Sequence, residues 1–501
     1  MPDAVVIGAG PNGLVAANLL ADAGWSVEVL EAEDRPGGAV KSGELVEPGY
    51  VNDQFSAFYP LAAASPVVRK LELSRFGLEW AQGPLVLAHP DLQGRCASLS
   101  RDLDETAASL DTFAAGDGDA WRRLYDYWRR AGSPLLDGMT TPFPPVRAAV
   151  RLGLRLRRDF LPFTRLGLLS VRRLADEHFR GEGGGRLIAG SAMHTDLLPE
   201  SAGGGFFGWF LTALGQTVGF PCARGGASSL TDALVRRLES KGGRVTCGVR
   251  VTEIVVEEGR ASGVRSTGGD VRASKAVLAD VHAVPLYLEL LPRQAVPNRV
   301  LRGIVHFDHD PATFKIDWTL DGPLPWSAAD ARRAPVVHVA ESIDELSVTQ
   351  AEIARGLVPS RPFLVVGQYS MADPTRMPAG KEVAWAYTHL PQQVDPGALA
   401  ERMEERLEAL APGFRDLVRH RRVWTPADLE QADSNLRGGA LNGGTAQLHQ
   451  QLVFRPIPGL GRPETPVKRL YLASASAHPG GGVHGAPGAI AAKAALHKLR
   501  R

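Results

Sequence analysis

The chain has 501 residues, of which 44% are hydrophobic and 22% charged, proportions that are ordinary for a globular protein with a large core. Its 56 basic and 55 acidic side chains nearly cancel, so there is no global positive charge to attract nucleic acid, and we expect no nucleic-acid partner. Three widely spaced cysteines, Cys96, Cys222 and Cys247, fit neither a disulfide framework nor a metal cluster.

The first residues predict a strand, a glycine turn, a helix and a second strand. A β-branched run, Ala4 to Ile7, leads into the glycine turn of residues 8–13, and an Ala/Leu-rich helix extends to Gly24. Such glycines allow a tight turn and a close approach to a pyrophosphate, which the helix N-terminus attracts. Val27 to Leu30 then precedes Glu31, about 20 residues past the turn, where an acid accepts hydrogen bonds from ribose hydroxyls and disfavours a 2′-phosphate. The unit predicts dinucleotide binding and argues against NADP.

No charged and apolar leader precedes this first strand, and no uninterrupted apolar run is long enough to span a membrane. These features predict a cytoplasmic protein, in which any membrane contact is local.

Residues from Val67 to about Glu200 have a mixed, largely helical pattern, which predicts an inserted domain rather than further parallel strands. Just after it, residues 203–211 combine glycines with aromatic side chains. They either line an apolar tunnel for a lipid-like substrate or belong to the core.

Within this insertion, residues 146–174 interleave arginines with Val, Leu and Phe. One interpretation is peripheral membrane contact, with the arginines on anionic headgroups and the apolar neighbours in the interface. The alternative is a solvated helical face. The arginines are Arg147, Arg151, Arg155, Arg157, Arg158, Arg165, Arg172 and Arg173.

An alternating pattern resumes near Gly225. It predicts a helix over 229–240, a hairpin that turns at 257–260, and a buried strand from Ala276 to Asp280 that returns to the first sheet. A second insertion from about 281 to 454 contains strand candidates at 314–320, 336–340, 363–366 and 383–387, and a helix that carries Leu399, Met403, Leu407 and Leu410.

The C-terminal segment predicts a strand over 470–473, a glycine-rich loop over 478–485 and a helix from about Gly488 to Leu499. A helix start that points at a flavin ring would stabilise the negative charge formed on reduction. His478 lies in this loop, where it could move a proton or bind the ring, or simply pack the loop. His484 and His194 are weaker candidates of the same kind.

The N-terminal fingerprint, the second glycine pair at Gly37 and Gly38, and the C-terminal glycine loop together resemble the FAD-binding pattern of the amine oxidase and carotenoid desaturase superfamily. The run from Leu472 to Val483 resembles the bacterial phytoene desaturase group and, more closely, the pyridine nucleotide-disulphide oxidoreductase domain-containing protein 2 type. Middle segments such as 373–375 and 425–430 are similar to that type as well. The resemblance covers nearly the whole chain and implies noncovalent FAD.

The expected fold is therefore α/β, with a Rossmann-like FAD-binding domain assembled from discontinuous segments and an α+β substrate domain that contains an antiparallel sheet and a helical part. The FAD-binding parts are expected at 1–66, 221–285 and 455–501, and the substrate domain at 67–220 and 286–454.

The resemblance also implies which residues contact the cofactor. Two positions depart from the pattern, because Ala39 replaces a frequent Arg and Ser474 replaces a usual glycine near the flavin. The expected cofactor-binding residues are Gly8, Ala9, Gly10, Pro11, Asn12, Gly13, Glu31, Ala32, Arg35, Gly37, Gly38, Val251, Ala475, Gly482 and Val483.

The function expected from this pattern is an FAD-dependent, desaturase-like oxidation of a small hydrophobic substrate, with electrons passed to oxygen, a quinone or another acceptor. One alternative is an amine or amino-acid oxidase, and another is a flavin- or partner-binding protein without catalysis. The chain has no second strand-bounded GxGxxG, since the cluster at 183–185 lacks the flanking strand and acid. We therefore expect that NADH and NADPH do not reduce the enzyme.

Overall fold

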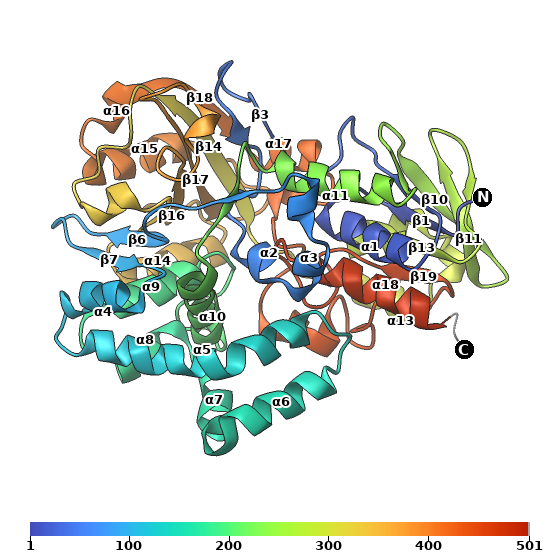
Figure 1. Cartoon of the computed structure of the whole chain (residues 1–501), viewed down its shortest axis with the longest axis horizontal. Coiled ribbons are helices and arrows are strands. Elements are labelled where there is room, and N and C mark those ends of the chain that lie inside the picture. The colour runs from blue at the N-terminus through green and yellow to red at the C-terminus, as the bar shows by residue number, and fades with distance from the viewer. Residues whose placement is uncertain (499–501) are drawn as a thin grey trace.

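A five-stranded parallel sheet lies on one side of the molecule, near both ends of the chain (Figure 1). In the computed structural model, which describes residues 1–498, its order is β19-β13-β1-β2-β9. Strands distant in sequence become neighbours, because β1 pairs in parallel with both β2 and β13. The strands are β1 (Ala4–Ile7), β2 (Val27–Leu30), β9 (Arg244–Thr246), β13 (Ala276–Ala279) and β19 (Leu470–Leu472). The expected Rossmann-like, discontinuous α/β fold is confirmed.

Three helices pack on this sheet, namely α1 (Pro11–Asp22), α11 (Ser228–Ser240) and α18 (Ala486–Lys498). The first and last of them touch closely, since a Cβ added at Gly488 would lie only 1.9 Å from the carbonyl oxygen of Asn12. Glycine is therefore required where α18 crosses α1. The expected end of this helix at Leu499 lies outside the described residues.

A small antiparallel sheet extends from the same domain and contains the predicted hairpin. Its strands are β10 (Val251–Glu257), β11 (Arg260–Ser266) and β12 (Val271–Arg272), with Glu257 paired to Arg260 at the turn. Short elements link this region to the rest of the chain: β3 (Ser42–Gly43), β4 (Asn52–Asp53), α2 (Pro60–Ala64), α3 (Pro66–Lys70), β5 (Trp80–Ala81) and β8 (Cys222–Ala223).

The second domain is built on a seven-stranded mixed sheet of order β18-β14-β17-β16-β15-β6-β7. Four of its strands fall where the sequence predicts them, and their inner face is continuously buried because helices and loops cover it. The strands are β6 (Leu87–Pro90), β7 (Cys96–Leu99), β14 (Ala312–Leu320), β15 (Val336–Val339), β16 (Leu364–Gln368), β17 (Glu382–Leu390) and β18 (Val418–Trp424).

Two parts of this sheet differ from the sequence-based expectation. The region after Val67 is not free of parallel strands, because β6 joins β15 in parallel through Ala88 and Val337. The hairpin formed by β6 and β7 is short, and β6 pairs with β15, which lies far along the chain. A local sequence pattern does not reveal this pairing. Edge strand β18 is rich in exposed charged residues. These residues protect the edge of the sheet from pairing with another chain, but they also hide the apolar pattern by which a strand is predicted from sequence.

Helices between β7 and β8 form the helical part, with α6 and α7 along the lower edge of the molecule, beyond α5 (Figure 1). They are α4 (Leu103–Asp111), α5 (Asp117–Met139), α6 (Val146–Leu156), α7 (Phe160–Leu166), α8 (Val171–His178), α9 (Glu182–Ala192) and α10 (Gly204–Val218). The later helices are α12 (Ala283–Pro285), α13 (Asn298–Ile304), α14 (Ile343–Ala354), α15 (Leu399–Leu410, as predicted), α16 (Phe414–Leu417) and α17 (Pro426–Ala432).

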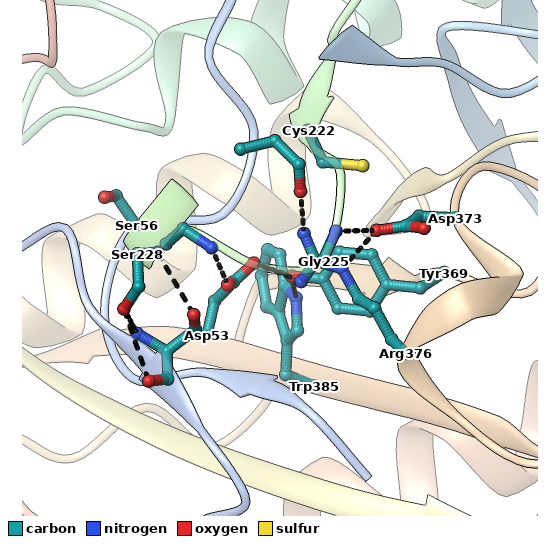
Figure 2. A network of polar contacts seen from close by, with 12 residues as sticks. Asp53, Ser56, Cys222, Gly225, Ser228, Tyr369, Asp373, Arg376 and Trp385 are labelled. Carbon is teal, nitrogen blue, oxygen red and sulfur yellow. Dashed lines mark hydrogen bonds and ion pairs between the residues drawn. The ribbon is translucent and has the colours of Figure 1, made fainter. Parts of the chain in front are cut away.

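A buried ionic network joins the two domains (Figure 2). Arg376 lies between Asp53 and Asp373, at 2.7 and 2.9 Å, and all three side chains are fully buried. The third guanidinium nitrogen of Arg376 donates to the carbonyl of Ala223, and the guanidinium plane stacks on the ring of Tyr369. Burial alone would lower the pKa of Arg376, but the attraction of Asp53 holds this pKa well above its ordinary value.

The same network reaches residues on both sides of the junction. The other oxygen of Asp53 accepts from the backbone N–H of Ala227, just before α11, at 2.7 Å. The Tyr369 hydroxyl donates to Asp53 and accepts from the indole N–H of Trp385 at 3.0 Å. One charge pair therefore fixes the start of a Rossmann helix and an aromatic side chain of the large sheet.

Replacing Arg376 with Met should lower the free energy of unfolding by about 3–5 kcal/mol, because two carboxylates are left buried without a cation. Urea denaturation followed by fluorescence measures the change. The matched control is Arg75→Met, which breaks an exposed pair with Glu72 and should cost within about 0.5 kcal/mol. Equal effects of the two substitutions would contradict the central role of this network.

Candidate active site

A cavity of about 730 Å³ connects the two domains. One end lies against the glycine turn after β1 and the residues that follow β2 and β13, and the other end reaches the inner face of the large sheet. Parallel α/β sheets bind ligands at the carboxyl ends of their strands, and this end of the cavity occupies that position.

The two N-terminal glycine turns pack against each other at the cavity. The backbone N–H of Gly37 donates to the carbonyl of Ala9 at 2.9 Å, and a Cβ added at Gly38 would lie 3.1 Å from the Cα of Gly10. Gly8 has a φ of +91°, and a Cβ there would lie 2.7 Å from the carbonyl of Asp280. Bare backbone therefore forms this wall, as a dinucleotide site requires.

Glu31 is buried at the end of β2 and borders the cavity. One carboxylate oxygen accepts from the N–H of Ala9 at 2.7 Å, and the other accepts from the N–H of Glu33 at 3.0 Å. These bonds fix the orientation of the acid, and each oxygen retains a lone pair for a further donor.

Asp280 follows β13 and packs against the fingerprint. Its carboxyl accepts from the N–H of Gly13 at 2.7 Å, and a Cβ added at Gly10 would lie 2.8 Å from the same oxygen. Burial raises the pKa of Asp280 to about 8, and the nearby acids Asp433 and Glu31 add to this effect. The carboxyl is therefore protonated at neutral pH and places no negative charge at this helix N-terminus.

The expected cofactor-binding residues divide into two groups. Most of them border the cavity, whereas Ala9, Gly13 and Gly37 support the wall from behind and Arg35 has an exposed side chain away from it. The bordering residues are Gly8, Gly10, Pro11, Asn12, Glu31, Ala32, Gly38, Val251, Ala475, Gly482 and Val483. Both departures from the family pattern, Ala39 and Ser474, also border it.

Arg455 is a site residue that the sequence reasoning missed. Its guanidinium is buried and donates to the backbone carbonyls of Asn442, Gly443, Thr445 and Ala475 at 2.8 to 3.2 Å. Burial lowers its pKa to about 10, which leaves it charged at neutral pH. It clamps the loop after Leu441 to the C-terminal glycine loop and adds a positive charge to the cavity wall.

The far end of the cavity is an aromatic chamber. Its floor is the inner face of the large sheet, where alternate residues of neighbouring strands point the same way. Trp385 and Tyr387 stack there with ring centroids 6.0 Å apart and planes 13° apart. The chamber residues include Phe58, Phe207, Phe210, Leu211, Phe220, Val336, Val365, Trp385 and Tyr387.

Segment 203–211 serves both purposes considered from the sequence. Phe207, Phe210 and Leu211 of α10 line the chamber, whereas Trp209 is fully buried in the core against Trp128. The glycine cluster at 183–185, by contrast, lies inside helix α9, where Gly183 and Gly184 pack against the rings of Phe113 and Phe179.

The three candidate histidines have different surroundings. His478 is not among the cavity-lining residues, its ring meets Phe143 edge to face, and burial lowers its pKa to about 4. His484 contacts the carbonyl of Gly481 and accepts from the N–H of Ala486, so it caps α18. His194, the weakest candidate from sequence, borders the chamber.

A lysine in the chamber floor is already paired. The ammonium of Lys315 lies 2.6 Å from Asp317 and donates to the carbonyl of Asp53 at 2.9 Å. This pair leaves the chamber floor without a free cation among the residues that the structure describes there.

The residues present fit a dinucleotide cofactor. Asn12 has a buried side-chain oxygen without a partner at the cavity, and Gly10 offers no side-chain cap to the N-terminus of α1. Hydrogen-bond capacity is thus left for a ligand where the glycine turns leave room. A discontinuous Rossmann-like domain that shares a long cavity with an aromatic chamber defines a dinucleotide-dependent oxidoreductase.

Residues 12–490 match the family described as flavin containing amine oxidoreductase, and the chain belongs to this family. It is an enzyme of the amine oxidase and phytoene desaturase superfamily, as the sequence motifs predict.

Curated relatives match over the full length. Pyridine nucleotide-disulfide oxidoreductase domain-containing protein 2 of Rattus norvegicus is 30% identical over 99% of this chain and 94% of its own. Lycopene-forming phytoene desaturase of Pseudescherichia vulneris is 25% identical over 100% of this chain and 99% of its own.

Solved structures share the fold. An oxidoreductase from Methanosarcina mazei superposes with a TM-score of 0.66 at 17% identity over 99% of both chains. A triple mutant of putrescine oxidase superposes with a TM-score of 0.63 at 16% identity, over 100% of this chain and 99% of its own. At these identities the likeness establishes the fold alone.

The raised pKa of Asp280 predicts a pH dependence of stability. Between about pH 4 and pH 8 the folded protein keeps a proton on this carboxyl that the unfolded chain releases, so stability falls as pH rises and levels off above about 8. Asp280→Asn removes the effect. The free energy of unfolding of the Asp280→Asn variant, relative to that of the wild type, should therefore rise through this pH window by up to about 1.4 kcal/mol per pH unit. We call this difference the stability advantage of the variant.

Denaturation of both proteins at pH 5, 6, 7, 8 and 9 measures this advantage. Asp433→Asn is the matched control, because burial raises the pKa of Asp433 to only about 6 and its advantage should stop growing near that pH. An Asp280→Asn advantage that is constant from pH 5 to pH 8 would refute the assignment.

Proposed function

We propose that the protein is an FAD-dependent oxidoreductase that oxidises a small hydrophobic substrate in a desaturase-like reaction. The observation that carries this proposal is the single cavity that connects the glycine turns of the Rossmann-like domain with the aromatic chamber. Family membership makes the cofactor a flavin, and the dinucleotide character of the turns makes FAD the form that fits.

In this proposal the ribose hydroxyls of the adenosine half bind Glu31, and the adenine meets the backbone at Val251. The pyrophosphate faces Gly10 and the N-terminus of α1, where protonated Asp280 avoids a repulsive charge. Ala475, Gly482 and Val483, which border the cavity, would hold the flavin ring. FAD, when bound, supplies the acceptor for a hydride from the substrate.

The remaining work of the protein is to bind, orient and enclose the substrate. Aromatic and aliphatic side chains such as Trp385, Phe210 and Leu211 hold an apolar substrate and keep water out of the chamber. Arg455 and the start of α18 place positive potential at the loop assigned to the ring, which favours negative charge there. The electron acceptor in this proposal would be oxygen, a quinone or another acceptor.

An amine or amino-acid oxidase is the second candidate. One observation favours it, the stacked pair of Trp385 and Tyr387 in the chamber, because aromatic faces attract ammonium groups. Release of peroxide with simple amines would support it over the desaturase-like reaction.

The purified protein should carry noncovalent FAD that denaturation releases intact. Glu31→Gln should weaken FAD binding at least about tenfold, since an amide replaces the charged acceptor. Titration of the apoprotein with FAD, followed by flavin fluorescence, measures this. Glu28→Gln is the matched control, on the same strand but away from the cavity.

A protein that neither carries nor takes up FAD would refute the proposal. Anaerobic titration of the holoenzyme with lipid extracts then tests the substrate class by bleaching of the flavin absorption. NADH and NADPH serve as the comparison and should leave the flavin oxidised.

We also propose that α6 and α7 contact an anionic membrane surface, from which an apolar substrate enters. Val146, Val150 and Leu154 form an exposed stripe along α6, and Leu161 of α7 continues it with 77% of its surface exposed. Met139, just before α6, borders the cavity. Within the described residues, no helix is long and apolar enough to cross a membrane.

The arginines of this segment do not all remain available for headgroups. Four of them pair with carboxylates of the protein, namely Arg151, Arg165, Arg172 and Arg173. The proposed contact therefore uses Arg147, Arg155, Arg157 and Arg158, which lie beside the apolar stripe.

Vesicles containing 30% phosphatidylglycerol should bind the protein at low salt and release much of it at high salt, as flotation measures. The triple variant Val150→Glu, Leu154→Glu, Leu161→Glu should stay unbound. Val348→Glu, at a similarly exposed position on α14, should bind as the wild type does. Equal flotation of the triple variant and the wild type would contradict membrane contact through this surface.

A further inference from the structure

Two buried polar side chains face the chamber without a hydrogen-bond partner. Thr313 on β14 and His389 on β17 lie directly opposite each other in the sheet register, and both border the cavity. They are only 1% and 4% exposed, and neither the Thr313 hydroxyl nor either ring nitrogen of His389 makes a hydrogen bond of good geometry, although the backbone of Ala312 and of Met193 lies near the imidazole. Leaving such groups unpaired is costly, so their position against a cavity indicates a ligand.

A third polar side chain gathers at the same end of the chamber. His194 also borders the cavity, and both it and His389 meet the ring of Tyr387 edge to face. One His194 nitrogen lies 3.2 Å from the Tyr387 hydroxyl, and the other lies 2.9 Å from a nitrogen of His338. These contacts hold the imidazole in place.

The two imidazoles of this polar end are neutral at neutral pH. Burial lowers the pKa of His389, and it lowers that of His194 to about 4, so both imidazoles are neutral. The cation of the same floor, Lys315, is neutralised by Asp317. A carboxylate bound here would lack a counter-charge, and the nearby Asp196 already accepts hydrogen bonds from Thr445 and Ala446, whereas a neutral polar group needs no counter-charge.

We propose that Thr313 and His389, beside the fixed imidazole of His194, form a subsite for a neutral oxygen function, a hydroxyl or carbonyl, on an otherwise apolar substrate. A neutral imidazole donates from one nitrogen and accepts at the other, and a hydroxyl does both, so either oxygen function is satisfied. The hydrocarbon part then lies along Trp385 and the phenylalanines of α10. The proposal rests on the proposed function in treating the cavity as the substrate chamber.

The substrate is thus an oxygenated apolar molecule rather than a pure hydrocarbon or a charged amine. A site built to hydrogen-bond an oxygen rejects the analogue that lacks it, because its own buried groups then stay unpaired. This specificity is separate from the chemistry at the flavin.

A ten-carbon series with different head groups tests this subsite directly. Calorimetric titration of the purified protein at pH 7 should give at least about tenfold tighter binding for decan-1-ol and decan-2-one than for decane, decylammonium or decanoate. Equal affinity for decane and decan-1-ol would overturn the proposal. So would tighter binding of decylammonium, which would favour an amine substrate.

Substitutions in the subsite test whether these residues cause the preference for an oxygenated ligand. His389→Phe combined with Thr313→Val should reduce the preference for decan-1-ol over decane to less than about twofold. Thr388→Val is the matched control, since Thr388 is equally buried and unbonded on the same strand but lies outside the cavity wall, and it should leave the preference unchanged. A preference that survives the double substitution would also overturn the assignment.

Flavin content, measured on the same samples, separates the two proposals. Alcohol preference in a protein that takes up no FAD would refute the proposed function and leave the subsite standing. Bound FAD without alcohol preference would do the reverse.

Discussion

The ion pair between Arg376 and Asp53 is the contact on which the arrangement of the two domains depends. Both side chains are completely removed from water, and their charges are tolerable only because each satisfies the other. Asp53 also holds the backbone before α11, the ammonium of Lys315 and the Tyr369 hydroxyl. The Rossmann-like domain and the floor of the chamber are therefore positioned against one another by the carboxylate and the backbone carbonyl of a single residue, Asp53.

The cavity between them uses buried polarity in two opposite ways. At the dinucleotide end, Asp280 is kept neutral so that the N-terminus of α1 remains attractive to an anion. Arg455 stays charged there although burial lowers its pKa to about 10, because Asp310 and Asp196 oppose that effect. In the chamber, imidazoles are kept neutral and partly unbonded. Burial is the largest cause of the neutral carboxyl and the neutral imidazoles, since it penalises whichever form carries charge.

The Rossmann-like part of the fold is largely predictable from sequence because its signals are local. A β-branched run, a glycine turn and an acid at a fixed spacing identify the unit from β1 to Glu31, and strand β13 is evident from its apolar run. The hairpin β6 to β7 was missed, because its stability comes from pairing with β15 far along the chain. Charged β18 was missed because its sequence protects an edge.

The candidate site was predictable to the same extent. The glycines are recognisable from their spacing in the sequence. Asp280 was also predictable, since it ends a predicted strand at the edge where parallel sheets bind ligands. Thr313 and His389 carry no such signal, because only the assembled sheet decides which face of β14 and β17 meets the cavity. His478 fits the packing role that the sequence left open, since its ring meets Phe143 and is not among the residues that line the cavity.

The sheet that supports the cofactor turns is completed late in synthesis. Strand β19 and helix α18 emerge from the ribosome long after β1, β2 and β13, and α18 must then settle on α1 at the contact between Gly488 and Asn12. Until that moment the nascent chain exposes the apolar faces of α1 and β13, which makes it a client for chaperones. Truncation that removes α18 would expose those faces permanently, and the truncated protein would be prone to aggregation and degradation rather than merely inactive.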